Sequence, residues 1–154
     1  MSRSHQEGKN HKVNTILSTR LKEKLEKIQQ ILNTLTEESS KETLIVVEGR
    51  KDQEALRYLE ITGPILTAKT GGKTFTETVQ EIEKTQPRKA ILLLDFDRRG
   101  REGTKRLKQE LEKTKIAPNL KFWQDLSALL GRDVQCVESL PAYIQTLRRK
   151  AAVL

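Results

Sequence analysis

Cysteine is nearly absent from this chain, which has Cys136 as its single thiol. One thiol cannot form a disulfide within the chain, and it cannot supply the ligands of a cysteine zinc site. Long apolar runs are missing too, because no stretch approaches the roughly 18–20 apolar residues that span a bilayer. Residues 1–12 hold no apolar signal segment. These absences exclude a disulfide scaffold and predict a protein of the cytoplasm that has no membrane partner.

The charge balance is strongly basic. The 154 residues carry 29 lysines and arginines against 21 acids, which gives a net charge of +8, and the pI is near 9.7. Such an excess suits a polyanionic partner, nucleic acid above all, although a generic basic surface gives the same balance. Its distribution favours nucleic acid, because residues 98–115 hold eight basic side chains against three acids.

The first part of the chain is polar and then amphipathic. Residues 1–13 are predicted to form a flexible polar tail, and a helix is predicted from residue 14 or 18 to about residue 38. Within residues 14–42, which comprise this helix and a linker, one apolar stripe recurs at spacings of four and three: Leu21, Leu25, Ile28, Leu32 and Leu35. We expect this stripe to pack on the domain, with docking to a second copy or to a protein or ribosomal partner as the alternative.

Short apolar runs alternate with helical segments through the remaining domain, residues 43–154. Strands are expected at 43–47, 64–68, 91–94 and 118–122, and helices at 52–60, 74–84, 103–113, 126–130 and 140–150. This alternation is typical of βαβ units and a parallel sheet. The predicted fold class is therefore α/β: a Rossmann-like open sheet of about four mainly parallel strands flanked by helices, plus the N-terminal amphipathic helix.

The most informative stretch runs over residues 91–100. Four aliphatic residues predict a strand buried on both faces, and Asp95 and Asp97 follow where that strand should end. Two acids this close repel each other, and both ionise readily only beside a cation or in water. One interpretation is therefore a metal site. The other is that the acids open a helix, where carboxylates favour the positive end of the helix dipole.

A third acid, Glu48, follows the first predicted strand and precedes Gly49. Right-handed crossovers place the ends of parallel strands on one edge, so Glu48 should lie with Asp95 and Asp97 if the first and third strands are neighbours. Three acids on one rim can hold Mg²⁺ through oxygen ligands and leave water positions for a phosphate. The glycine would let a phosphate approach the backbone closely.

These motifs resemble those of the Toprim domain. Residues 48–52 match its pattern E-G-x-x-D, and residues 95–100 match D-x-D-x-x-G. Topoisomerases of types IA and II, bacterial primases, overcoming-lysogenization-defect nucleases and the bacterial maturase of 5S ribosomal RNA share this domain. The resemblance covers residues 43–121, and the nearest look-alikes are small, chiefly archaeal stand-alone Toprim proteins and the N-terminal half of the maturase.

The resemblance implies a role for each matched residue. Glu48 would be the general acid or base of phosphodiester chemistry. The metal, Mg²⁺ or Mn²⁺, would be held by Asp95, Asp97 and Glu48. The supporting residues would be Gly49, Asp52 and Gly100. Basic side chains near the same edge would contact nucleic acid: Arg50, Lys51, Lys69, Lys73, Arg98, Arg99 and Arg101.

Two larger enzyme classes and one competing motif are disfavoured. Arg99 stands where topoisomerases often carry a third acid, and Tyr58 and Tyr143 are better explained as packing residues than as catalytic tyrosines. A complete primase would need zinc-binding and polymerase segments that this chain lacks. The run G-G-K-T at residues 71–74 imitates a P-loop, but the first glycine of that motif would fall on Thr67.

Two functions therefore remain open. One is a Mg²⁺-dependent enzyme that hydrolyses RNA phosphodiesters or matures ribosomal RNA, and the intact acidic trio favours it. The other is a non-catalytic RNA-binding or ribosome-associated Toprim module, which the small size of the chain favours. RNA is preferred over DNA only through the resemblance to the maturase.

Overall fold

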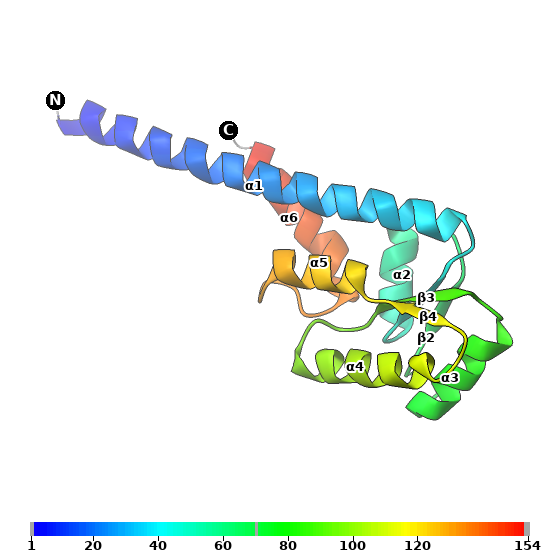
Figure 1. Cartoon of the computed structure of the whole chain (residues 1–154). Coiled ribbons are helices and arrows are strands. Elements are labelled where there is room, and N and C mark those ends of the chain that lie inside the picture. The colour runs from blue at the N-terminus through cyan, green and yellow to red at the C-terminus, as the bar shows by residue number, and fades with distance from the viewer. Residues whose placement is uncertain (1, 70, 153–154) are drawn as a thin grey trace.

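The computed structural model describes residues 2–69 and 71–152, with side chains from residue 19 onward. The strands are β1 (Leu44–Val47), β2 (Ile65–Thr67), β3 (Lys89–Leu93) and β4 (Ala117–Asn119). The helices are α1 (Ser2–Ser40), α2 (Arg50–Tyr58), α3 (Phe75–Lys84), α4 (Arg98–Glu112), α5 (Lys121–Leu130), the short 3₁₀ helix η1 (Val137–Ser139) and α6 (Leu140–Ala152). Figure 1 shows their arrangement.

The strands form one sheet in the order β2-β1-β3-β4, and every neighbouring pair is parallel. Val47 at the end of β1 is aligned with Leu93 in β3 and with Thr67 in β2. The predicted α/β class and parallel sheet are therefore confirmed. So is the condition that the first and third strands are neighbours, which brings their carboxyl ends to one edge.

The apolar side chains of the central strands alternate between two cores, one on each face of the sheet. Ile45 and Ile91 belong to the core that α1, α2, α5 and α6 complete, whereas Val46 and Leu92 belong to the core beneath α3 and α4. Because both faces are covered, β1 is buried at every position. This explains why its sequence is a continuous apolar run without alternation.

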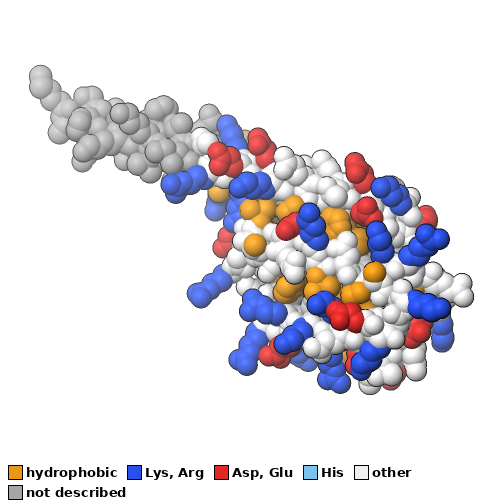
Figure 2. All heavy atoms as spheres, viewed as in Figure 1, with side chains coloured by type: hydrophobic (Ala, Val, Ile, Leu, Met, Phe, Trp, Pro, Cys, Tyr) orange, Lys and Arg blue, Asp and Glu red, His pale blue; other side chains and the backbone are white. Residues whose placement is uncertain are grey.

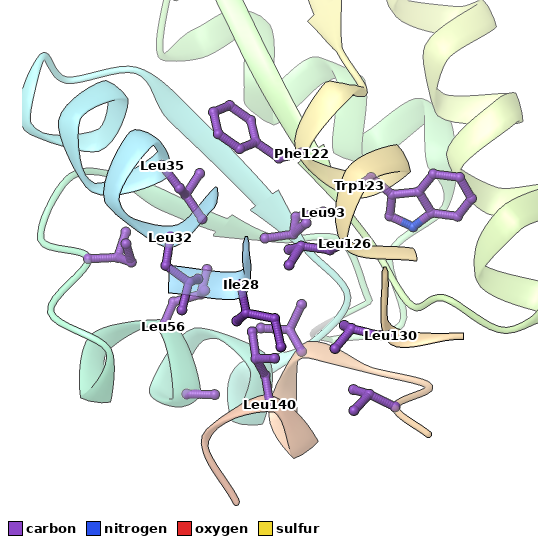
Figure 3. Packing of buried hydrophobic residues seen from close by; sticks show 14 of the residues in the cluster. Ile28, Leu32, Leu35, Leu56, Leu93, Phe122, Trp123, Leu126, Leu130 and Leu140 are labelled. Atoms are coloured by element: carbon purple, nitrogen blue, oxygen red, sulfur yellow. The ribbon is translucent and has the colours of Figure 1, made fainter. Parts of the chain in front are cut away.

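Helix α1 forms part of the first of these cores. Ile28, Leu32 and Leu35 are buried in the same cluster as β1 and β3, and Figure 3 shows them meeting side chains from α2, α5 and α6. Leu21 and Leu25 are half-buried against that cluster. The expected packing of the stripe on the domain is confirmed, so these five residues do not form a free face for a partner.

Three helices begin five or more residues earlier than predicted. Helix α5 begins at Lys121, not at residue 126, and so includes Lys121 and Phe122, which were expected in the fourth strand. Helix α1 begins at Ser2, although a flexible tail was predicted for residues 1–13. Met1 and the side chains of residues 2–18 lie outside the part of the chain that the structure describes. No proline occurs before Pro64 and Gly8 is the lone glycine of this segment, so little in the sequence interrupts the helix. Helix α4 begins at Arg98, not at residue 103, because the Asp97 side chain caps it.

No helix in the described part of the chain is long and apolar enough to cross a lipid bilayer. This agrees with the short apolar runs of the sequence.

A close backbone contact fixes the end of α1 against the loop before β2. The N–H of Gly63 donates to Oγ of Ser39 at 2.8 Å, and Ser39 is fully buried. A methyl group on Gly63 would stand 2.2 Å from the backbone oxygen of Ser39. The loop can approach the helix this closely because residue 63 has no side chain.

We predict that Gly63→Ala lowers the free energy of unfolding by about 2–3 kcal/mol, because the added methyl group meets backbone that cannot give way. Urea denaturation measures this. Gly49→Ala is the control, since a methyl there would meet Oδ2 of Asp52 at a relaxed 4.0 Å. Equal unfolding midpoints for the two variants would contradict the prediction.

Candidate functional site

The first two acids of the candidate site meet because β1 and β3 are paired. Glu48 follows β1 and Asp95 follows Leu94, which continues the chain after β3. The backbone N–H of Asp95 donates to Oε2 of Glu48 at 3.2 Å. The Glu48 carboxylate is largely buried, with 12% of its side chain exposed. The sheet edge thus brings together two residues that lie far apart in the sequence.

Lys69 supplies a positive charge at the same place. The chain after β2 continues the parallel pairing with β1, so the backbone N–H of Lys69 donates to the carbonyl oxygen of Glu48 at 3.0 Å. Its ammonium group then forms an ion pair with Oε1 of Glu48. The sequence suggested Lys69 as a phosphate contact, whereas in the structure it is the counter-ion of the predicted catalytic acid.

Asp95 has an unfavourable electrostatic environment. Burial, followed by the negative charges of Glu48, Asp52 and Asp97, raises the pKa of its carboxyl to about 7, although Lys69 acts in the opposite direction. A carboxyl group with this pKa is only partly ionised at neutral pH. A cation near Asp95 would therefore lower the energy of the site.

The chain around Asp95 is tightly fixed. The indole Nε1–H of Trp123 donates to the carbonyl oxygen of Asp95 at 3.2 Å, and the N–H of Phe96 donates to the carbonyl of Gln135 at 2.7 Å. A methyl group on Gly100 would stand 2.0 Å from that same Asp95 oxygen. Glycine at position 100 therefore has a steric purpose, which fits the supporting role given to it.

Asp97 opens helix α4. Its Oδ1 accepts the N–H of Gly100 at 2.7 Å, which satisfies one of the free donors at the helix start. The interpretation of this acid as a helix cap is therefore confirmed. The cap uses Oδ1, and the carboxylate keeps further lone pairs that a metal could bind.

Asp52 supports the first motif from inside the protein. It is only 6% exposed and accepts the N–H groups of Gly49 at 3.0 Å and Glu138 at 2.9 Å. Burial nevertheless raises the pKa of its carboxyl, against the effect of these two hydrogen bonds. Asp52 thus joins the loop after β1 to the start of η1, a contact that no sequence pattern predicts.

The predicted metal trio is not a closed set of ligands. Among the described residues, the group whose ligand atoms all lie within 4.8 Å of one another is Asp52, Cys136 and Glu138. The backbone hydrogen bonds of Asp52 and an ion pair of 3.9 Å between Lys51 and Glu138 already engage this group. In the described part of the chain, the trio of the two motifs is not such a group, and Glu48 and Asp97 already contact Lys69 and the start of α4.

The predicted nucleic-acid contacts occupy the starts of two helices that begin at this edge. Arg50 and Lys51 open α2 and are exposed. Three further exposed arginines lie in the first turns of α4, namely Arg98, Arg99 and Arg101. Figure 2 shows blue side chains gathered over the part of the surface that α4 forms. Lys73 differs, since its ammonium group is held by the carbonyl of Thr67 at 2.6 Å and by Glu81 at 3.0 Å.

A pocket of about 330 Å³ adjoins the Glu48 side of the edge. It is bounded by the chain between β2 and α3 and by residues of α3 and α4, and the lining includes Phe75 and Arg106. No sequence pattern distinguishes either residue. Arg106 was one charge in a basic run, and Phe75 followed the G-G-K-T turn without any pattern of its own.

Comparison with known proteins gives a fold match and a family. No protein-family model matches the chain. A solved structure of a protein from Aquifex aeolicus aligns with a TM-score of 0.61 over 72% of this chain and 95% of that chain, at 24% identity, and so supports the fold alone.

Archaeal relatives in sequence cover most of the chain. A UPF0292 protein of Methanosarcina acetivorans is 30% identical over 133 residues, which are 86% of this chain and 90% of that protein. A UPF0292 protein of Methanocaldococcus jannaschii is 32% identical over 123 residues, 79% of this chain and 93% of that protein. The chain therefore belongs to the UPF0292 family.

Proposed function

We propose that this UPF0292 chain is a Toprim-type, Mg²⁺-dependent protein of the cytoplasm that hydrolyses RNA phosphodiesters, as in the maturation of ribosomal RNA. The observation that carries the proposal is the contact between Glu48 and the backbone of Asp95 at the ends of two neighbouring parallel strands. Ligands of open α/β sheets bind at this edge. The exposed basic turns of α2 and α4 begin there too, which suits a polyanionic substrate.

The acidic residues fit a hard divalent cation in their chemistry. Carboxylate oxygens are the ligands that Mg²⁺ and Mn²⁺ prefer, and burial together with the neighbouring carboxylates raises the pKa of Asp95. Such an ion, when bound, supplies Lewis-acid stabilisation of charge on a phosphodiester oxygen. Glu48, once released from Lys69, would accept the proton of the attacking water. Asp95 and Asp97 would hold the ion.

The second candidate function is an RNA-binding or ribosome-associated module without catalysis. One observation favours it: Lys69 already neutralises Glu48, and Asp97 already caps a helix. A site whose acids have internal partners can retain its shape without a metal. RNA would then be held by the basic helix starts alone, and the same edge of the sheet would serve as a scaffold.

We predict that the protein with Mg²⁺ cuts structured RNA at discrete positions and that Glu48→Gln abolishes the cuts while RNA binding is retained. The amide keeps the shape of the side chain but cannot accept a proton. Gel analysis of end-labelled RNA measures cleavage, and Glu54→Gln on the exposed side of α2 is the matched control. Tight RNA binding without cleavage under any metal condition would refute catalysis and favour the module.

The raised pKa of Asp95 predicts that the free energy of unfolding depends on pH. In the unfolded chain this carboxyl titrates near pH 3.9, and in the folded protein near pH 7. The folded state therefore holds the proton more tightly, so Asp95 lowers stability progressively as the pH rises from about 4 to about 7, and the full cost remains above that range.

We therefore predict that Asp95→Asn matches the wild-type protein in stability near pH 4 and exceeds it by about 1–2 kcal/mol at pH 8. Urea denaturation at both pH values measures the difference. Adding Mg²⁺ at pH 8 should stabilise the wild-type protein more than the variant. The same stability difference at both pH values would show that the charge of Asp95 is not the cause.

Both candidate functions predict a salt-sensitive interaction with RNA. Replacing Arg98 and Arg99 with alanine should weaken binding about tenfold or more at low salt and flatten the dependence of affinity on salt. Filter binding at several salt concentrations measures both effects. The matched control replaces Lys113 and Lys115 with alanine. This double substitution removes the same amount of positive charge beyond the other end of α4. Equal losses in the two double variants would mean that binding is not localised at the sheet edge.

A further inference from the structure

The pocket beside Glu48 is lined partly by cationic side chains and partly by apolar ones. Three cationic side chains border it, those of Lys69, Lys73 and Arg106, while Leu94 and Ala68 contribute nearly buried apolar surface. Its volume of about 330 Å³ lies at the small end of the range of about 300–1,000 Å³ that is usual for ligand sites. A ligand that fills it should be small, with both an anionic part and an apolar part.

The three cations are not equally available to an anion. Lys73 is held by Thr67 and Glu81, and its side chain is only 15% exposed. Arg106 forms no ion pair among the residues whose side chains are described, and its guanidinium lies 5.3 Å from the centroid of the Phe75 ring. Lys69 is half-exposed and shared with Glu48. An anion would therefore be received by Arg106 and Lys69.

The apolar part of the pocket suits a planar ring. Phe75 is partly buried against the core beneath α3 and α4, and a methyl group on Gly103 of α4 would approach its ring to 3.3 Å. The contact supports the ring, and stacking on a supported aromatic ring is a common way for proteins to hold a nucleobase. Inorganic phosphate alone would leave this apolar surface uncovered.

We propose that this pocket binds one nucleotide, with its phosphate between Lys69 and Arg106 and its base against Phe75 and Leu94. The assignment to RNA and the adjoining role of Glu48 rest on the function proposed above; the pocket itself does not. A base can enter only when it has left its helix, so the substrate class is RNA with an unpaired nucleotide and not a continuous duplex. The phosphate would also compete with Glu48 for Lys69.

Calorimetric titration of the full chain in EDTA tests the pocket without any metal. The ligands are adenosine monophosphate, adenosine, inorganic phosphate, single-stranded oligoadenylate and an RNA duplex. We expect the monophosphate to bind at least tenfold more tightly than adenosine or phosphate, and the single strand to bind more tightly than the duplex. Equal affinity for monophosphate and phosphate would overturn the nucleotide assignment. Monophosphate binding without a preference for the single strand would overturn the assignment to RNA in favour of a free nucleotide.

Substitutions locate the binding. Arg106→Gln should weaken the monophosphate complex about tenfold or more, because a charged hydrogen-bonding partner is lost. Phe75→Leu should weaken it at least threefold while the affinity for phosphate stays the same. Lys105→Gln, an exposed neighbour on α4, is the matched control. Wild-type affinity in both pocket variants would refute the site.

The two proposals fail separately. If the monophosphate binds but RNA is never cut in Mg²⁺, the hydrolytic function is wrong and the pocket stands. If RNA is cut and both pocket variants cut it like the wild-type protein, the pocket is wrong and the hydrolytic function stands.

Discussion

The parallel pairing of β1 with β3 is the constraint on which the site depends. It aligns Val47 with Leu93, so the residues that follow both strands leave the sheet at the same level. The contact between Glu48 and Asp95 is a direct result. The pairing is stable because the two cores cover both faces of the strands, and the buried ladder excludes water. An acidic site therefore forms where burial and the neighbouring acids make the charge of Asp95 costly, and this gives the site its need for positive charge.

That need is met in part by the protein itself. Lys69 reaches Glu48 because the chain after β2 continues the parallel ladder, so the counter-ion is positioned by the same sheet as the acid. On the proposed function, this arrangement would link the binding of a cation to the binding of an anion. An anion that takes Lys69 from Glu48 would leave Glu48 free for a cation.

The features that depend on a short-range pattern of residues could be predicted from the sequence. The strands were found because β1 and β3 are uninterrupted apolar runs, and the edge of the sheet was found because acids follow both. The start of α4 was placed at residue 103, although Asp97 had been considered as a helix opener. Gly100 and Gly103 argue against a helix there until the close approach of Gly100 to Asp95 is seen. The pairing of Lys69 and the pocket were missed for a different reason. Both depend on which segments become neighbours across the sheet, which no local pattern encodes.

The packing of α1 against α6 joins the first helix of the chain to the last. During synthesis, the apolar side chains Ile28, Leu32 and Leu35 are made early, whereas α6, which completes their core, is made after every other described element. A chain that has not yet reached α6 leaves part of this apolar surface uncovered, and such surface favours aggregation.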